Sequence, residues 1–432
     1  MSYSKDTRTL QTGDIYVAIR GERYDGHAFV DEAIRKGASA VVVEQSFDVG
    51  DLPSHVAVTS VDDSVTYLAE AACDLVEEHG PEVVAITGSV GKTSTKNAIA
   101  TVLGTKFDVL ASEGNFNTVL GLALTVLNGD FDGRSKLVLE MGACQEGDIT
   151  ELCGYFRPTV AVVTNVYGVH LETFGTLKTV ARTKGEIVAA LESGGTACLN
   201  ADDPLVRNMA ERHGGRTIFF GEHGQVTPRD LTVDLPLLGN HAVQNALAAF
   251  AVGRALGLEP CDINAALVTL KPEKGRLQKL PGINGITLVD DSYNASPAST
   301  LAALDVLQDL HATRAIAFLG DMLELGGPSH VEHVRILEAA LDRCDDVYPV
   351  GPLMGKAARQ VGLFGNHFES SREAALALRE EDMSMVRFGD VVLVKGSQGT
   401  RMERISRALL SEEVIPEEVL PRQDAPWLAG EQ

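Results

Sequence analysis

The chain has 432 residues, of which 44% are apolar and 22% are charged, and its formal net charge at pH 7 is -23. A single domain usually spans roughly 100 to 200 residues, so this length predicts two or three domains with substantial cores. The negative charge argues against nonspecific binding to nucleic acid or anionic lipid, because both partners are anions. The same acidity is also expected of a protein adapted to a salty cytosol. Composition alone therefore does not decide what the negative charge is for.

The sequence predicts neither a membrane span nor an export signal. Its longest apolar runs reach about ten residues, and the first 30 residues carry charged side chains in place of an apolar core. The six cysteines are scattered without a CxxC pair, which argues against a structural zinc site or a disulfide framework. We therefore expect a cytoplasmic protein with reduced thiols.

The N-terminal segment has the pattern of a small α/β domain. Residues 13–45 predict a strand, a glycine turn, an amphipathic helix and a second strand that includes Val41 to Val43. Residues 60–79 predict a helix that ends at the Gly-Pro-Glu sequence of residues 80–82. A first domain of residues 1–80 follows.

Two further series of strands and helices follow residue 80. Apolar runs such as VVAIT, KLVLEMG, TVAVVTN, TACLN and TIFFG alternate with helical patterns up to a long helix over residues 240–257. Continuous apolarity is typical of parallel strands that helices cover on both faces. A third series begins near residue 286, and the tail over residues 421–432 has no periodicity and is expected to be frayed. The predicted fold is therefore α/β with three domains, namely residues 1–80, a central parallel sheet over 81–284, and a Rossmann-like domain over 285–432.

The segment VVAITGSVGKTSTKNAIATVLG, residues 83–104, places a glycine-rich loop between a strand and a helix. Such a loop directs backbone N–H groups at an anion, Lys92 can approach the outer phosphates of a nucleotide, and the Thr93 hydroxyl can bind Mg²⁺. Ile86 stands where the longer phosphate-loop pattern has its first glycine, so the match is to the shorter form GxxGKT. The alternative is an ordinary glycine turn.

Three residues outside the loop are candidate metal ligands. Glu140 lies at the end of a buried strand, where a carboxylate commonly completes a magnesium site, although it could be a solvated strand end. His170 also follows a strand, but a histidine in such a loop is more often hydrogen-bonded than metal-bound. Lys184 would repel Mg²⁺ unless CO₂ carboxylated it, and the residues alone favour a surface lysine.

Ten motifs occur in order along nearly the whole chain. They are DTRTLQTGDIYVAIRGERYDGH (6–27), TGSVGKTSTK (87–96), EGNFNTVLGLALTVL (113–127), VLEMGA (138–143), HLETFGTLKTVARTKGEI (170–187), LNADD (199–203), GNHAVQNALAA (239–249), KGRLQ (274–278), DDSYNASPAS (290–299) and LVKGSQGTRME (393–403). With these motifs the chain resembles the Mur ligases, the ATP-dependent amide-forming enzymes of peptidoglycan precursor synthesis. The DDSYNASP and VKGS segments resemble most the branch that adds D-alanyl-D-alanine to UDP-N-acetylmuramoyl-tripeptide.

The resemblance implies that residues 81–284 bind ATP, that residues 1–80 bind the UDP substrate, and that an acyl phosphate is the intermediate. It implies a nucleotide site in which His241 and Asn245 meet adenine, Arg276 the outer phosphates and Asp291 the ribose. The implied phosphate loop is Thr87, Gly88, Ser89, Val90, Gly91, Lys92 and Thr93. The implied catalytic residues are Lys92, Glu140, His170 and Lys184, and the implied ligands of two Mg²⁺ ions are Thr93, Glu140, His170 and a carbamylated Lys184.

The resemblance also implies substrate contacts and partners. The implied substrate residues are Asp6, Thr7 and Arg8 with residues 20–25 for the uridine end, Asn115 and Asn117 near the muramoyl group, Tyr293 and Asn294, and Lys395, Gly396 and Ser397 for the peptides. The partners would be UDP-N-acetylmuramoyl-tripeptide and D-alanyl-D-alanine, with no nucleic acid and no membrane, and the enzyme would be a monomer.

Other interpretations remain open at this point. The closest is another amide ligase of the same superfamily, with a different acceptor or of the folylpolyglutamate synthase type. A nucleotide-binding regulator without ligase activity is a second, and a phosphate-loop kinase or transport ATPase is a less favoured third. Individual site residues also have ordinary explanations. Asp291, for example, could cap the helix that follows it, although Ser296 competes for that position.

Overall fold

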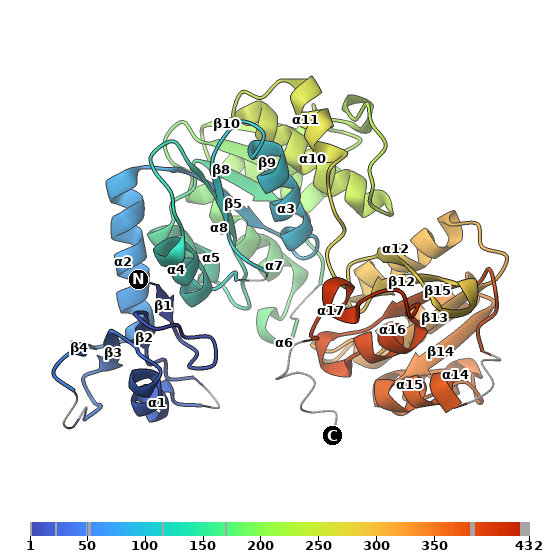
Figure 1. Cartoon of the computed structure of the whole chain (residues 1–432). Coiled ribbons are helices and arrows are strands. Elements are labelled where there is room, and N and C mark those ends of the chain that lie inside the picture. Colours follow the sequence, from blue (N-terminus) through green and yellow to red (C-terminus); the bar gives the residue numbers. More distant parts are fainter. Residues whose placement is uncertain are drawn as a thin grey trace. The chain divides into compact units, whose positions relative to one another are not determined.

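The computed structural model describes residues 2–21, 24–48, 50, 53–114, 116–168, 171–380 and 385–423. These residues form three sheets, which Figure 1 shows in sequence colours. The chain divides into two compact units, of which the first comprises Met1–Asn165, Ala181–Asp230 and Leu247–Ile263, and the second Val166–Val180, Leu231–Ala246 and Asn264–Gln432. The first unit holds two of the sheets and the second unit holds the third. The domain boundaries near residues 80 and 285 stay predictions.

The N-terminal sheet has the strand order β1-β2-β3-β4, with every pair parallel. The strand–helix–strand pattern predicted over residues 13–45 is confirmed. The helix predicted over 60–79 is also present and begins at Ser64, because the Asp63 carboxylate accepts a hydrogen bond from the Thr66 N–H at 2.7 Å. The elements are β1 Tyr3–Ser4, β2 Ile15–Val17, the 3₁₀ helix η1 Gly26–Phe29, α1 Val30–Arg35, β3 Ala40–Glu44, β4 Ala57–Val61 and α2 Ser64–His79.

The central sheet has the order β10-β9-β8-β5-β7-β6, again with every pair parallel. Strands β7, β8 and β9 are buried along their whole length, as the continuous apolar runs predicted. The strands are β5 Glu82–Thr87, β6 Val109–Ala111, β7 Lys136–Glu140, β8 Val160–Val163, β9 Thr196–Asn200 and β10 Arg216–Phe220. Strand β6 was not predicted, because three residues are too few to show a pattern.

Helices follow the strands of the central sheet, and the predicted long helix over 240–257 is present as α10. They are α3 Lys92–Leu103, α4 Val119–Asn128, α5 Asp148–Tyr155, α6 Leu171–Phe174, α7 Leu177–Lys184, α8 Glu186–Ala189, α9 Pro204–Arg207, η2 Asn208–Arg212, η3 Pro228–Asp230, α10 Asn240–Ala255 and α11 Pro260–Leu267. Figure 1 shows α2 as a long blue helix beside α4 and α5, and α2 packs against both.

The C-terminal sheet has the order β11-β12-β15-β13-β14, with β11 antiparallel at one edge. Successive residues of β15 enter different cores: Leu393 packs with α12, α13 and α14, whereas Val392 and Val394 pack with α15 and α16. The predicted doubly wound arrangement is therefore present, with helices on both faces. The elements are β11 Gln278–Pro281, η4 Ile283–Gly285, β12 Thr287–Asp291, α12 Pro297–Asp309, β13 Ala315–Gly320, α13 Ser329–Leu341, β14 Asp346–Val350, α14 Pro352–Val361, α15 Ser371–Glu380, β15 Val391–Lys395, η5 Gln398–Thr400, α16 Glu403–Leu409 and α17 Pro416–Val419.

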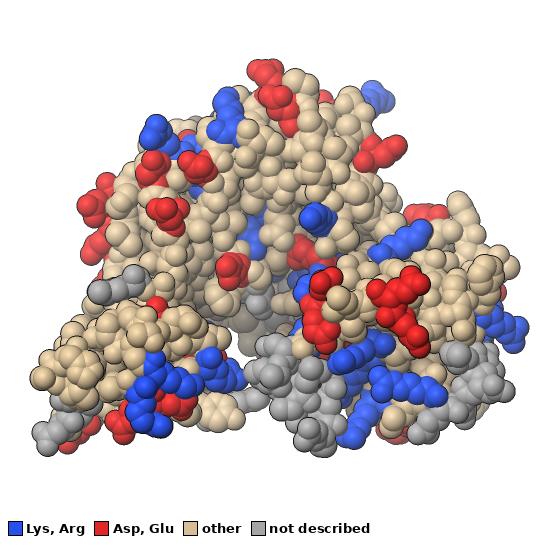
Figure 2. All heavy atoms as spheres, viewed as in Figure 1, with Lys and Arg blue, Asp and Glu red and all other residues tan. Residues whose placement is uncertain are grey.

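The surface carries both signs of charge in spite of the net charge of -23. Figure 2 shows Lys and Arg side chains among the acidic ones on the visible face, with broad uncharged areas between them. Positive groups are therefore available locally for an anionic ligand. Among the residues that the structure describes, no helix is long and apolar enough to cross a bilayer.

Candidate functional site

The glycine-rich loop lies at the carboxyl edge of the central sheet, between the end of β5 and the start of α3. Strands β7 and β8 flank β5 in parallel, so the residues that follow all three strands meet at this edge. Thr87, the last residue of β5, joins two of these ends, because its hydroxyl donates to the Met141 carbonyl at 2.8 Å. Gly88 has φ +149°, and a Cβ there would lie 2.0 Å from Thr164 Oγ1. The close approach of the β8 end therefore requires glycine at position 88.

Asn165, which follows β8, fixes the shape of the loop. The N–H groups of Ser89 and Val90 donate to its carbonyl and side-chain oxygens at 3.0 and 2.9 Å. The Val90 carbonyl in turn accepts from Asn165 Nδ2 at 2.9 Å and from Thr164 Oγ1 at 2.8 Å. Our sequence reasoning missed both supporting residues, although a Thr-Asn pair directly after an apolar run is a signal for them.

The end of the loop presents a helix N-terminus and a lysine. Helix α3 begins after Gly91, which has φ +82°, and no side-chain hydrogen bond caps its start. Helix α3 has 12 residues, and its uncapped N-terminus favours binding of an anion, because the first amide groups and the helix dipole present positive charge there. The Lys92 ammonium donates to the carbonyls of Gly88 and Ser89 at 3.0 and 3.4 Å, which keeps its charge over the loop. Thr93 is buried in the first turn.

Glu140, the last residue of β7, brings a buried carboxylate to the same edge of the sheet. Its side chain is only 1% exposed, and its Oε1 accepts from Asn117 Nδ2 at 2.9 Å. Its Oε2 is buried without a hydrogen-bond partner in the described structure. An unpartnered buried carboxylate oxygen is costly, and Mg²⁺ would satisfy it. The unpartnered oxygen of Glu140 therefore fits a magnesium ligand. Asn117 lies beside Glu140, and Asn115 falls outside the described residues.

Lys96 supports this arrangement and was not among the predicted site residues. It lies one helical turn after Lys92 on α3, and its buried ammonium donates to the carbonyls of Ser112 and Gly114, the latter at 3.0 Å. The Ser112 hydroxyl accepts from the Glu140 N–H at 3.2 Å. Lys96 thus ties the segment that precedes Asn117 to the helix of the phosphate loop. The second lysine of GKTSTK is the sequence signal that could have found it.

Lys184 is buried, so the interpretation of a surface lysine that the residues alone favoured is wrong. Its side chain is 2% exposed at the end of α7, and burial, with the nearby charge of Lys92 as the second cause, lowers its pKa to about 7. Its amine is therefore partly neutral near pH 7, unlike an exposed lysine. His170, the predicted second metal ligand, lies outside the described residues. In the part of the chain that the structure describes, no group of three or more His, Cys, Asp or Glu side chains could hold a metal ion.

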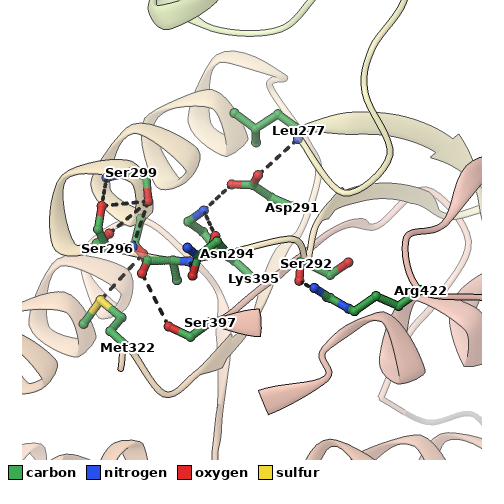
Figure 3. A network of polar contacts seen from close by, with 12 residues as sticks. Leu277, Asp291, Ser292, Asn294, Ser296, Ser299, Met322, Lys395, Ser397 and Arg422 are labelled. Atoms are coloured by element: carbon green, nitrogen blue, oxygen red, sulfur yellow. Dashed lines mark hydrogen bonds and ion pairs between the residues drawn. The ribbon is translucent and has the colours of Figure 1, made fainter. Parts of the chain in front are cut away.

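A second group of predicted residues gathers at the carboxyl ends of β12 and β15 in the other unit. The parallel register places Asp291 opposite Lys395, and Lys395 Nζ lies 2.5 Å from Asp291 Oδ2 (Figure 3). Lys395 also donates to the Asn294 carbonyl at 3.0 Å, and Asp291 Oδ1 accepts from the Leu277 N–H at 3.2 Å. Asp291 is therefore not the cap of α12. Ser296 takes that position and, with Ser299, forms a capping box.

Ser397 completes this group from the loop that follows β15. Its hydroxyl accepts from the Leu323 N–H at 2.9 Å and donates to the Ala295 carbonyl at 3.4 Å. Lys395 and Ser397 are both buried, and their contacts with Asp291, Asn294 and Ala295 hold the 291–295 loop in this structure. Their predicted peptide contacts stay predictions.

The residues predicted for the nucleotide lie in the same unit. The Arg276 guanidinium lies 4.4 Å from the centre of the Tyr293 ring, a cation–π contact. Burial, partly opposed by the charge of Asp291, lowers the pKa of His241, so its imidazole is neutral near pH 7 and suits contact with an uncharged base. Asn245 is buried on the same helix. Their roles toward ATP stay predictions.

The residues predicted for the uridine end lie in the N-terminal sheet and its loops. Arg8 pairs with Asp6 at 2.6 Å, and its hydrogen bonds lower the pKa of that carboxyl. Thr7 donates to Glu32 at 3.1 Å. Arg20 lies 3.5 Å from Asp25, whereas residues 22 and 23 fall outside the description.

Comparison with known proteins shows the family to which the chain belongs. Sequence models match three consecutive parts of the chain, described as "Mur ligase family, catalytic domain" over residues 3–86, "Mur ligase middle domain" over 86–253 and "Mur ligase, glutamate ligase domain" over 275–398. The UDP-N-acetylmuramoyl-tripeptide--D-alanyl-D-alanine ligase of Bacillus subtilis (strain 168) is 34% identical over 427 residues, which covers 94% of this chain and 92% of that protein. The chain belongs to the Mur ligase family. The ligase of the same name from Escherichia coli (strain K12) is 35% identical over 429 residues, with the same shares covered.

Solved structures of Mur ligases agree in fold. MurF from Acinetobacter baumannii gives a TM-score of 0.83 at 28% identity, covering 94% of this chain and 92% of that one. MurF ligase from Thermotoga maritima in complex with ADP gives 0.79 at 31% identity, covering 94% and 96%. The predicted fold of three α/β domains, each built on its own sheet, is therefore confirmed for this Mur ligase.

The geometry of Gly88 yields a first prediction for this Mur ligase. Gly88→Ala is expected to weaken ATP binding at least about tenfold and to lower the free energy of unfolding by roughly 1–3 kcal/mol, because the new methyl group displaces Thr164 and thereby the loop. Nucleotide titration and thermal unfolding measure the two effects. Gly154→Ala, on α5, is the control, since a Cβ there meets no atom within 4 Å. Normal ATP affinity in Gly88→Ala would contradict the role of this close approach.

Proposed function

We propose that this Mur ligase adds D-alanyl-D-alanine to UDP-N-acetylmuramoyl-tripeptide, with ATP cleaved to ADP and phosphate, in peptidoglycan precursor synthesis. The observation that carries the chemistry is the glycine loop with Lys92 at an uncapped helix start, next to a buried Glu140 with an unpartnered oxygen. The observation that carries the substrate class is the similarity, over 94% of the chain, to ligases that carry this name.

The reaction requires activation of a carboxylate, because joining a carboxylate to an amine in water is unfavourable. In the proposed sequence, a carboxylate oxygen of the tripeptide attacks the γ-phosphorus of ATP, and ADP leaves. The amine of D-alanyl-D-alanine then attacks the carbonyl carbon of the acyl phosphate. The tetrahedral intermediate expels phosphate with the former carboxylate oxygen, and the amine loses a proton.

Positive groups of the chain let two anions approach each other. Two unit charges 4 Å apart repel by about 4 kcal/mol at an effective dielectric constant near 20. In the proposal, Lys92, the start of α3 and Arg276 offset this repulsion and stabilise the charge on the transferring phosphoryl group. Thr93 and Glu140 would hold Mg²⁺, which supplies further neutralising charge when bound.

Lys184 has a separate role in the proposal. A neutral amine can attack CO₂ to form a carbamate, which is an anion and a metal ligand, whereas an ammonium cannot. The buried position of Lys184 and its pKa of about 7 support this modification. With His170, the carbamylated side chain would hold a second Mg²⁺ ion.

The remaining roles extend the proposal to the other unit and to the partners. In the proposal, the phosphate loop binds the phosphates of ATP, His241 and Asn245 meet adenine, Arg276 meets the outer phosphates and Asp291 meets the ribose. Asp6, Thr7 and Arg8 would bind the uridine end, and Asn117 would lie near the muramoyl group. Lys395, Gly396 and Ser397 would contact the peptides, and Tyr293 and Asn294 would contribute further substrate contacts. We propose that the enzyme is cytoplasmic and that it is a monomer. Light scattering tests the monomeric state.

A substrate panel tests the proposed function. The purified chain is incubated with ATP and Mg²⁺, and phosphate release is measured with each acceptor alone and with both. We expect release to require UDP-N-acetylmuramoyl-tripeptide and D-alanyl-D-alanine together, with a product of the summed mass less one water. Turnover with folylpolyglutamate substrates or another nucleotide-linked acceptor would instead favour a different ligase of the superfamily. ATP binding without turnover on any acceptor would favour a regulator.

A further inference from the structure

The segment Leu420–Gln423, here called the C-terminal strap, packs against the loops of the second group of site residues. The expectation that residues 421–432 are frayed is wrong for 421–423, because the Arg422 side chain is only 6% exposed. Leu420 is 1% exposed in the core beneath α15 and α16. Residues 424–432 fall outside the description. The chain thus has an ordered segment after α17, which the lack of periodicity in its sequence did not predict.

Arg422 directs its guanidinium at the backbone of the loop that carries Tyr293. Nη2 donates to the Ser292 carbonyl at 2.7 Å, as Figure 3 shows, and Nη1 donates to the Tyr293 carbonyl at 3.1 Å. Nη2 also lies 2.7 Å from Oε2 of Glu403, whose side chain is 1% exposed. The buried Glu403 carboxylate orients the guanidinium, and the oriented guanidinium holds the Ser292 and Tyr293 carbonyls.

The strap also contacts the turn that carries Arg276. Gly275 has φ +71°, and a Cβ there would lie 2.9 Å from the Tyr293 N and 3.0 Å from Pro421 Cγ. The Tyr293 N–H donates to the Gly275 carbonyl at 3.1 Å, and Lys274 donates to the Glu417 carbonyl at 2.7 Å. The turn that carries Arg276, the loop that carries Tyr293 and the C-terminal strap therefore pack against one another.

The Tyr293 ring joins the two arginines. The guanidinium carbon of Arg276 lies 4.4 Å from the ring centre and that of Arg422 lies 5.7 Å from it. An aromatic ring attracts a cation through its negative face, so the position of the ring influences where Arg276 rests. Loss of the Arg422 fork would release the Ser292 and Tyr293 carbonyls and, with them, the ring on which Arg276 lies.

From these contacts we propose that Arg422 is a positioning residue of the ligation site, which holds Tyr293 and thereby Arg276 in the geometry that receives the outer phosphates of ATP. The inference rests on the proposed function, in which Arg276 meets those phosphates. In this inference the C-terminal strap contributes to the affinity for ATP, in addition to covering the hydrophobic core with Leu420. Lysine cannot replace Arg422, because a single ammonium lacks the planar fork that donates to two carbonyls and a carboxylate.

The test compares Arg422→Lys and Arg422→Gln with the matched control Arg314→Gln. Arg314 is also a largely buried arginine that makes ion pairs, with Asp346 at 2.5 Å and Asp390 at 2.8 Å, but it precedes β13 and so lies at the amino ends of the strands, away from the site loops. Its replacement removes two ion pairs, where replacement of Arg422 removes one, and leaves the loop that carries Tyr293 unchanged. All variants are assayed below the temperature at which the least stable begins to unfold. The measurements are KM for ATP, kcat, and the Kd of a nonhydrolysable ATP analogue.

We expect both Arg422 variants to raise KM for ATP and the Kd of the analogue about tenfold, as loss of one held phosphate contact would do, and to change kcat less. Arg314→Gln is expected to lower the melting temperature and to leave both constants near the wild-type values. Equal constants in the Arg422 variants and wild type, with only a lower melting temperature, would overturn the inference. Because the wild type is measured on the same substrates, its failure to ligate would instead overturn the proposed function.

Discussion

Replacing Lys92 with alanine is expected to abolish ligation while the protein remains folded. The carbonyls of Gly88 and Ser89 hold the ammonium over the loop, and without it the transferring phosphoryl group loses a positive partner. We expect kcat to fall by about 10³-fold. Phosphate release in the complete reaction measures the loss, and thermal unfolding followed by circular dichroism measures the fold.

Lys106→Ala is the matched control for this experiment. Lys106 is also a lysine in the same unit that donates to a backbone carbonyl, that of Gly257 at 3.1 Å, but it follows the far end of α3. Its loss is expected to leave kcat within about twofold of wild type. Near-normal phosphate release by Lys92→Ala would count against the role of the loop.

Loss of Lys184 is expected to have the second-largest effect. If the carbamate forms, enzyme freed of dissolved CO₂ should lose most of its activity and regain it when bicarbonate is added. Lys184→Arg retains a positive charge but cannot form the carbamate, and we expect its kcat to fall by about 10²-fold or more, without recovery in bicarbonate.

The pH dependence of Lys184 has a definite sign. Only the neutral amine reacts with CO₂, and the pKa of about 7 means that the neutral fraction falls as pH falls through 7. When the concentration of dissolved CO₂ is kept equal at both pH values, reactivation is therefore expected to be slower at pH 6 than at pH 8. Full activity of CO₂-free enzyme, together with normal turnover by Lys184→Arg, would show that the lysine is not a modified ligand.

The buried strands and the phosphate loop could be predicted from the sequence because local patterns determine them. Continuous apolar runs indicated five of the six central strands, and GxxGKT between a strand and a helix indicated the loop. Strands β1, β4, β6 and β11 were not predicted. Strands β1 and β6 have only two and three residues, β4 is mostly exposed, and β11 mixes polar with apolar residues. In each of these strands, pairing with a neighbour determines the structure.

The burial of Lys184 and the contacts of Arg422 and Lys395 could not be predicted, because they depend on contacts between distant segments. Lys184 ends a strongly amphipathic helix in which a lysine would ordinarily face solvent, yet its side chain is buried. Arg422 meets Ser292 and Tyr293 across 129 or more residues of sequence. The pairing of Asp291 with Lys395 likewise follows from strand register, which neither motif reveals by itself.

The central claim is that the chain uses ATP to activate a carboxylate of the tripeptide, and isotope transfer tests it most directly. The reacting carboxylate of UDP-N-acetylmuramoyl-tripeptide is labelled with ¹⁸O, and the chain is supplied with D-alanyl-D-alanine, ATP and Mg²⁺. We predict that each released phosphate carries one ¹⁸O atom and that the amide product retains the other. Unlabelled phosphate, or phosphate released without an amide product, would contradict the account.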